Sequence, residues 1–239
     1  MSREDILVQA ARELDISLSE IQVKQFIKYY EILVEWNSFM NLTGITEYEE
    51  VVVKHFVDSL LIVKSFDISS VESLIDVGTG AGFPGIPLKI IYPDINVVLL
   101  DSLNKRIKFL NEVINQLGLK KIETIHGRAE DFGGDKNYRE KFDLCVSRAV
   151  ANLATLSEYC IPFVKKNGYF IPFKSGKIAD EVEEAKKAVK ILGGSLEEVR
   201  PLMLPNTDIE RSFVIIHKIE NTKKIYPRSA GKPSKEPLK

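Results

Sequence analysis

The residues with the clearest chemical potential form a glycine-rich run, D-V-G-T-G-A-G-F-P-G, at residues 76–85. The run follows an apolar stretch and precedes a helix-like one, so it predicts a tight turn between a strand and a helix. Glycines at such a turn let a ligand approach the backbone closely. The dinucleotide fingerprint G-x-G-x-x-G fails, because Phe83 stands where its third glycine belongs. A phosphate-binding P-loop is excluded as well, because no Lys-Ser/Thr pair follows the glycines.

What remains is the pattern acidic-x-G-x-G-x-G, which Asp76 leads and Gly78, Gly80 and Gly82 continue. This pattern resembles motif I of the S-adenosylmethionine-dependent methyltransferases. A flexible strand–helix turn without a ligand is the plain alternative, and the density of glycines argues against it. The resemblance implies S-adenosylmethionine as the cofactor.

The ends of the next two predicted strands carry residues that fit the same ligand. Asp101 ends V-V-L-L-D, 23 residues after Gly78, where an acidic side chain accepts hydrogen bonds from ribose hydroxyls. Ala129 and Glu130 follow the third strand, where folds of this kind contact the adenine ring. Taken alone, Glu130 would rather be a helix cap or a surface charge.

The fourth predicted strand ends in S-R-A-V, residues 147–150, and lacks the D/N-P-P-Y/F motif of amino-group methyltransferases. Cytosine-C5 enzymes need a thiolate nucleophile, but Cys145 and Cys160 lie in apolar stretches and are interpreted as core residues. These absences favour an acceptor that needs no activation, such as N7 of guanine. Oxygen atoms and small molecules remain open as acceptors. No acid, base or nucleophile is expected, and catalysis is expected to rest on placement.

The elements that must position these residues are short β-rich runs that alternate with helical runs. Alternation at this spacing predicts a Rossmann-like α/β fold of the class I methyltransferase type, with a mostly parallel sheet and an antiparallel C-terminal edge. The expected strands are Ser73–Val77, Val97–Asp101, Ile122–His126, Phe142–Ser147, Tyr169–Phe173, Leu196–Leu202 and Phe213–Lys218. The expected helices between them include Asn104–Leu117, Asn152–Val164 and Ile178–Leu192.

Two further segments flank this domain, which is expected to span residues 67–220. Residues 1–66 predict a helical extension, in which Ser19 with Gln22 and Thr46 with Glu49 match capping boxes. Residues 221–239 are rich in Lys, Pro and Ser and predict a loosely held basic tail.

Composition sets outer limits on the kind of protein. Of the 239 residues, 44% are hydrophobic and 28% are charged, which is typical of a folded globular chain. Residues 1–60 carry a charge of −6 and residues 218–239 a charge of +5, so a polyanion is expected to meet the tail first. The sequence predicts no signal peptide, no membrane span and no metal site, since its three histidines lack ligand spacing. Two unpaired thiols indicate the cytoplasm.

Several flanking motifs make the resemblance specific to one family. Over nearly its full length the chain resembles the RsmG (glucose-inhibited division protein B) family of 16S rRNA guanine-N7 methyltransferases. The motifs are W-N-x-x-x-N-L-T (36–43), H-F-x-D-S (55–59), the glycine run, D-S-x-x-K-R (101–106), R-A-E (128–130), S-R-A-V-A (147–151) and Y-P-R-x-x-G-x-P (226–233). The resemblance implies methylation of N7 of a guanine in the 530 loop. It also implies a cofactor pocket lined by Gly78, Phe83, Ala129, Glu130 and Arg148. Gly80 of the glycine run and Asp101 at the end of the second strand are expected to line the same pocket.

Four residues are candidates for placing the acceptor. Arg148 could place the guanine or the methionine carboxylate of the cofactor. His55 and Asp58 lie three residues apart on one predicted helix and could share a hydrogen bond on the acceptor side, or form a purely structural pair. Asn41 is expected to cap a helix or turn the chain, with an RNA contact as the second possibility.

Five residues are candidates for contacts with RNA. Lys105 and Arg106 could hold phosphates, although Lys105 equally fits a plain surface charge. Lys174 could reach RNA, but K-S-G replaces the Lys-Gly that the family often has there. Tyr226 could stack on a base and Arg228 could hold a phosphate.

The expected partner is 16S rRNA, within the small ribosomal subunit or an assembly intermediate, and the chain is expected to be a monomer. Two other functions stay open. One is a methyltransferase for a small metabolite, which would not need the basic tail. The other is a ribosome-assembly or RNA-binding factor that retains cofactor binding without transferring the methyl group.

Overall fold

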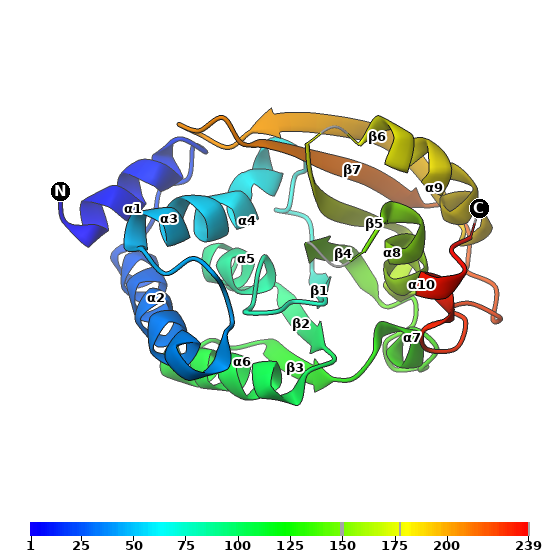
Figure 1. Cartoon of the computed structure of the whole chain (residues 1–239), viewed down its shortest axis with the longest axis horizontal. Helices are drawn as coiled ribbons and strands as arrows, with labels where there is room; N and C mark the ends of the chain where they lie inside the picture. Colours follow the sequence, from blue (N-terminus) through cyan, green and yellow to red (C-terminus); the bar gives the residue numbers. More distant parts are fainter. Residues whose placement is uncertain (149–150, 177, 239) are drawn as a thin grey trace.

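The computed structural model describes residues 1–148, 151–176 and 178–238. Ala149 and Val150, which belong to the S-R-A-V-A motif, lie outside this described part. Figure 1 shows a central sheet between helices, with the N-terminal helices on one side and the C-terminal segment on the other. The strands are β1 (Ser73–Val77), β2 (Asn96–Asp101), β3 (Ile122–His126), β4 (Phe142–Arg148), β5 (Val164–Ser175), β6 (Gly194–Met203) and β7 (Glu210–Lys218).

The sheet has the order β3-β2-β1-β4-β5-β7-β6. Neighbours from β3 to β5 pair in parallel, so their carboxyl ends meet at one edge. The expected mostly parallel sheet is confirmed, and its antiparallel strand can now be placed. β7 runs antiparallel between β5 and β6, and β6 forms the outer edge. The chain order reverses between β1 and β4, where folds of this class bind ligands.

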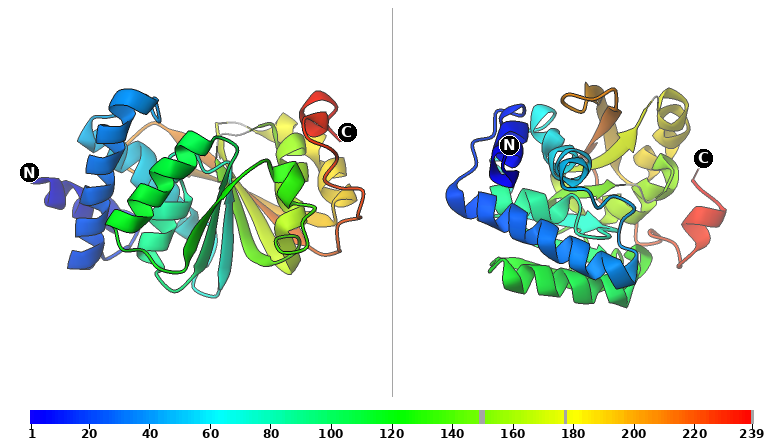
Figure 2. Two further views of the ribbon diagram at one scale, coloured as in Figure 1. Left: turned by 90° about the horizontal axis from the view of Figure 1, so that it is seen from below. Right: turned by 60° about the vertical axis from the view of Figure 1, so that its left-hand side comes forward.

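Two layers of helices cover the sheet because successive strand residues point to opposite faces. Leu74 of β1 packs in one core with helices of the N-terminal half, whereas its neighbour Ile75 packs in the other core. Figure 2 shows the sheet between these two layers. The first layer includes α5 (Gly85–Ile91) and α6 (Asn104–Gln116), and the second contains α8 (Leu153–Cys160) and α9 (Ala179–Ile191).

The helices of residues 1–66 share the first core. They are α1 (Arg3–Arg12), α2 (Glu20–Met40), α3 (Tyr48–Val51), the π-helix η1 (Val52–Val57), α4 (Asp58–Leu60) and the 3₁₀ helix η2 (Leu61–Lys64). Ser19 caps α2, and Gln22 completes the predicted capping box. The second predicted box is wrong: α3 follows Glu47, and no side chain caps it.

The predicted helix Asn152–Val164 is too long in its last part. Asn152 caps α8 through Thr155, but α8 ends at Cys160 and the 3₁₀ helix η3 (Ile161–Phe163) follows. Val164 already begins β5, because it pairs with Phe142 of β4. This pairing lengthens β5 well beyond the predicted strand at Tyr169–Phe173.

The C-terminal segment is docked, which corrects the expected loose tail. Arg228 makes a two-pronged ion pair with Glu158 of α8, which is fully buried (Nε–Oε1 2.9 Å, Nη2–Oε2 2.6 Å). Arg139 donates to the carbonyl groups of Thr222 and Tyr226 (2.7 Å each). Helix α10 (Lys232–Lys235) lies beside α8, near α7 (Ala129–Phe132) (Figure 1). The segment therefore covers the second layer of helices.

We predict that Arg228→Ala lowers the free energy of unfolding by about 3 kcal/mol, because it leaves the buried Glu158 carboxylate without its partner. Urea unfolding followed by circular dichroism measures this change, with the exposed Lys232→Ala as the matched control. An Arg228→Ala protein as stable as the control would contradict the docked arrangement.

Candidate functional site

The glycine turn after β1 has a left-handed backbone at Gly78, Gly80 and Gly82, with φ values of 72°, 63° and 95°. Side chains other than glycine rarely adopt these values. Gly82 also has no room for a Cβ atom, which would lie 2.6 Å from Ile86 Cδ1 and 2.7 Å from the Tyr29 hydroxyl oxygen. That hydroxyl donates a hydrogen bond to the carbonyl group of Ala81. Helix α2 thus holds the turn from the N-terminal layer.

Asp76 supports the turn from below. Its Oδ2 accepts hydrogen bonds from the Thr79 hydroxyl (2.7 Å) and the Gly85 amide (2.8 Å). Its Oδ1 is buried and has no hydrogen-bond partner among the described residues. Burial is the largest influence on this carboxyl group and raises its pKa to about 6. This oxygen atom is shielded from solvent, and Asp76 lines neither of the two cavities at this edge of the sheet, so we assign the carboxyl group to the support of the turn.

Asp101 connects the turn to the end of β2. Its Oδ2 accepts from the Gly80 amide (2.9 Å), and its Oδ1 accepts from the Leu103 amide (2.9 Å). Arg106 Nη1 lies 3.2 Å from the same carboxylate. The structure therefore places Arg106 against Asp101, a predicted cofactor residue, and the contact of Arg106 with RNA phosphate stays a prediction.

A cavity of about 230 Å³ opens between the ends of β1, β2 and β3. Among its lining residues are Gly78, Asp101, Ala129 and Glu130, all of which were predicted from the sequence to contact the cofactor. Tyr159 of α8 also lines it. Tyr159 was not predicted from the sequence, because only the packing of α8 across the sheet brings it here. These residues fit the adenosine part of S-adenosylmethionine.

The C-terminal segment reaches the rim of this cavity. Glu130 Oε1 accepts a hydrogen bond from the Gly231 amide at 2.8 Å. Arg228 is used inside the protein by Glu158, so the structure gives no support to its predicted phosphate contact. Tyr226 is half-buried on the same side. The tail residues therefore lie beside the 230 Å³ cavity.

A second cluster forms where β4 ends. Arg148 Nη1 donates to Asp58 Oδ2 (2.8 Å), and its guanidinium lies over the ring of Phe83, 5.0 Å from the centroid. Asp58 is 2% exposed and also accepts from Arg211 Nε of β7 (2.6 Å). Phe83 and Arg148 thus join the glycine turn to this cluster and do not line the 230 Å³ cavity.

His55 does not share the predicted hydrogen bond with Asp58. Its Nε2 lies 2.8 Å from the Thr43 hydroxyl, and its ring stacks on Phe83 with centroids 4.6 Å apart. Burial, and then the charge of Arg148, lower the pKa of His55 to about 4. The imidazole is therefore neutral at pH 7 and forms part of an aromatic wall.

A cavity of about 420 Å³ lies beside this cluster, and cationic side chains dominate its polar lining. The residues that line it are Ile45, Lys54, His55, Asp58, Arg148, Phe173, Lys174, Ser175, Ile209 and Arg211. Lys174, a predicted RNA residue, is paired with Glu181 (2.6 Å). Arg211 was missed, because nothing in its local sequence separates it from a surface arginine.

Two predicted residues lie at the end of α2. Asn41 ends this helix with a left-handed backbone (φ 50°), which confirms the expected cap. Lys105 is exposed, and its Nζ lies 3.2 Å from the Met40 carbonyl oxygen. Any contact of either residue with RNA stays a prediction.

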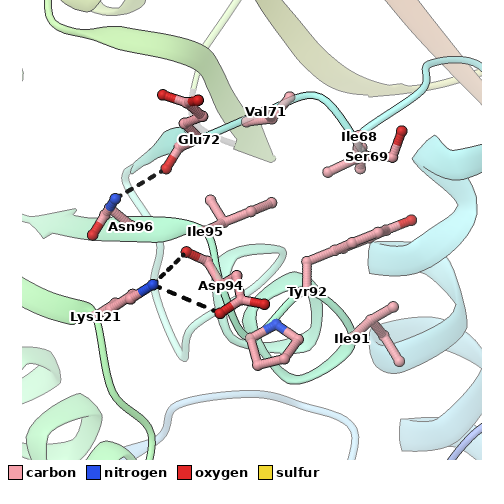
Figure 3. A pocket seen from close by; sticks show the side chains of 11 residues that line it. Ile68, Ser69, Val71, Glu72, Ile91, Tyr92, Asp94, Ile95, Asn96 and Lys121 are labelled. Atoms are coloured by element: carbon pink, nitrogen blue, oxygen red, sulfur yellow. Dashed lines mark hydrogen bonds and ion pairs between the residues drawn. The ribbon is translucent and has the colours of Figure 1, made fainter.

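A further cavity, of about 540 Å³, lies at the opposite end of the sheet, where β1, β2 and β3 begin. Figure 3 shows its lining, in which Lys121 pairs with Asp94 and Asn96 contacts Glu72. Ligands of open α/β sheets bind at the carboxyl ends of the strands, so we assign this cavity no role in the reaction.

Neither metal nor thiol chemistry finds support in the described residues. They contain no group of three or more His, Cys, Asp or Glu side chains that could hold a metal ion. Both cysteines are buried and free, and burial raises the pKa of the Cys145 thiol well above its usual value. A thiolate nucleophile is therefore not available at Cys145.

Comparisons with known proteins agree with this geometry. The model of the family GidB, rRNA small subunit methyltransferase G, matches residues 22–210. A protein from Lachnoclostridium phytofermentans called Ribosomal RNA small subunit methyltransferase G is 59% identical over 97% of this chain and 96% of its own length. A protein of the same name from Alkaliphilus oremlandii is 52% identical over the full length of both chains.

Similar solved structures show the fold. A SAM-dependent methyltransferase from Aquifex aeolicus has a TM-score of 0.53 and 18% identity, covering 71% of this chain and 93% of its own. TYW2 from M. jannaschii, solved in complex with AdoMet, has a TM-score of 0.52 and 18% identity over 69% of this chain and 76% of its own.

We predict that Asp101→Asn raises the dissociation constant for S-adenosylmethionine about tenfold or more, because a charged acceptor at the end of β2 is lost. Titration calorimetry measures this constant. The matched control is Asp94→Asn, an exposed acid at the far end of the sheet. Equal affinity of the two variants would remove Asp101 from the cofactor site.

We predict that His55 makes stability depend on pH between about 6.5 and 4. In this range the unfolded chain protonates His55 and the folded chain does not, so stability is lost as the pH falls, by up to about 3 kcal/mol. Asp76 contributes the opposite slope, since its pKa is raised in the folded state. Urea unfolding at pH 7.5 and 4.5 should therefore show a smaller loss in His55→Gln than in the wild type. An equal loss in both would mean that His55 titrates normally.

Proposed function

The chain belongs to the GidB family, rRNA small subunit methyltransferase G, and we propose that it methylates N7 of one guanine in the 530 loop of 16S rRNA. It is an S-adenosylmethionine-dependent methyltransferase that acts on 16S ribosomal RNA. The observation that carries the proposal is the position of Arg148. This residue lies between Phe83 of the glycine turn and Asp58 at the cationic cavity, and so connects the cofactor side to an acceptor side.

The chemistry of N7 suits the side chains at this place. S-adenosylmethionine supplies a methyl group on a sulfonium, and the lone pair of guanine N7 carries no proton, so no general base is needed. Asp58 is held by two guanidinium groups, and His55 is bound to Thr43. The chain would therefore act by placing the two reactants, which contributes about 7–11 kcal/mol when the alignment is good.

The residues that would hold the cofactor are those of the cavity of about 230 Å³ and of the glycine turn beside it. Asp101 would accept from the ribose hydroxyls, Ala129 and Glu130 would contact the adenine ring, and Gly78 and Gly80 would let the ligand approach the backbone.

Two cavities lie near the carboxyl ends of the strands, and the larger cavity is the one of about 420 Å³ beside Arg148 and Arg211. A polyanion suits this larger cavity better than a small apolar metabolite does. Arg148 and Arg211 line it around a single carboxylate, Asp58, and their excess positive charge would attract a phosphate backbone. This lining speaks against the small-molecule alternative. The assembly-factor alternative predicts cofactor binding without transfer, so a single-turnover assay separates it from the enzyme.

A monomeric state and a cytoplasmic location complete the proposal. None of the helices in the described part of the chain is long and apolar enough to cross a membrane. Both cysteines are free and buried, as is usual where thiols stay reduced. The substrate would be the small ribosomal subunit or an intermediate of its assembly.

We predict that this protein transfers label from S-adenosylmethionine to small ribosomal subunits isolated from cells that lack it. Chemical cleavage at N7-methylguanine should then produce a single break, in the 530 loop. Label at another atom or position would contradict the proposed acceptor. Cofactor binding without label in RNA would favour the binding factor or a small-molecule acceptor.

A further inference from the structure

Two arginines at the larger cavity share a single buried carboxylate. Asp58 accepts from Arg148 Nη1 through Oδ2 (2.8 Å) and from Arg211 Nε through Oδ1 (2.6 Å). The carboxylate is 2% exposed, whereas the side chains of Arg148 and Arg211 are 16% and 19% exposed. Asp58 therefore lies behind the two guanidinium groups, which meet the solvent of the cavity.

The charges in this cluster do not balance. Asp58 is the only carboxylate in the described part of the chain with which either arginine forms an ion pair. The other cations of the cavity have partners of their own, since Lys174 pairs with Glu181 and Lys54 with Glu50. One positive charge is thus left over in a partly desolvated place, where an anion gains more than it does on an open surface.

The donors of Arg211 are not used up either. Its Nη1 contacts the Glu210 carbonyl oxygen at 3.2 Å, and its Nη2 lies 3.5 Å from Asp58 Oδ2, at the limit of a hydrogen bond. The short Nε contact holds the plane of the guanidinium group in place. An arginine held this way presents a rigid pair of N–H donors, the arrangement that matches a phosphate group.

We propose that Arg211 and Arg148 together bind a backbone phosphate of the RNA beside the methylated guanine, and that Asp58 is the positioning residue that orients both. This inference rests on the proposed function, because it takes the larger cavity as the acceptor side. It reassigns Asp58 from a contact with RNA to a support, and it adds Arg211 as an RNA-binding residue.

The carboxylate of the cofactor is a second possible source of the anion. The position of Arg211 favours the RNA. Arg211 belongs to β7, which is separated from β4 by β5. It lines the larger cavity but not the cavity at Gly78 and Asp101. An arginine that held the cofactor would change cofactor affinity, and this can be measured separately.

The test uses full-length Arg211→Ala and Arg211→Lys with small ribosomal subunits from cells that lack the protein. Arg211→Ala should raise KM for subunits about tenfold or more, because a charge-assisted contact is lost. Its kcat and its dissociation constant for S-adenosylmethionine should stay within about twofold of the wild type. Arg211→Lys keeps the charge without the paired donors, so its KM for subunits should lie between those of the wild type and Arg211→Ala.

A salt titration gives a readout that a merely structural role would not change. The slope of log affinity for subunits against log salt should become shallower by about 0.7 in Arg211→Ala, the value for one lost phosphate contact with single-stranded RNA. Arg200→Ala is the matched control, because this arginine of β6 bonds Glu198 and the Ser65 carbonyl away from the cavity. It should keep the wild-type slope and KM.

The outcomes separate the inference from the proposed function. A wild-type KM and slope in Arg211→Ala would overturn the inference, and so would a weakened affinity for S-adenosylmethionine. If the wild type binds subunits without methylating them, the proposed function fails. The salt slopes would still decide whether Arg211 binds a phosphate. Circular dichroism confirms that each variant is folded, which is expected because Asp58 keeps Arg148 as a partner.

Discussion

A left-handed backbone at three glycines between β1 and α5 is the constraint on which the rest of the site depends. Such a turn is costly to hold open, since glycine loses much conformational entropy on folding. Asp76 holds it from the core, Asp101 from the end of β2, and Tyr29 from helix α2. Because these contacts come from three separate segments, the N-terminal helices help to fix the turn that would hold the cofactor.

The second cluster, at the end of β4, is arranged around a single negative charge. One buried carboxylate, Asp58, organises side chains from β4 and β7, and a neutral His55 completes the wall without adding charge. A protonated imidazole would repel Arg148, so the lowered pKa of His55 and the arginine cluster support each other. The result is a preorganised cationic surface beside the glycine turn, as the proposed reaction, which depends on placement, would require.

The C-terminal segment is held against α8 and reaches Glu130. Arg228 anchors it on a fully buried glutamate, and Gly231 then contacts Glu130 at the rim of the cofactor cavity. Its remaining described lysines, at positions 223, 224, 232 and 235, are exposed. The segment thus carries exposed positive charge and also borders the cavity that would hold the cofactor.

Much of this protein could be predicted from the sequence because the relevant signals are local. The spacing of the glycines and of Asp101, the alternation of strands with helices and the capping box at Ser19 each depend on neighbours within a few residues or on strand order. Tertiary structure alone decided which buried carboxylate each arginine meets. The sequence motifs predict a ligand contact for Arg148 and Arg228 alike, and nothing in the local sequence marks Arg211. Their roles differ because Glu158 and Asp58, each far along the chain, are buried beside them, and only the packing of the layers sets which cation each buried carboxylate meets.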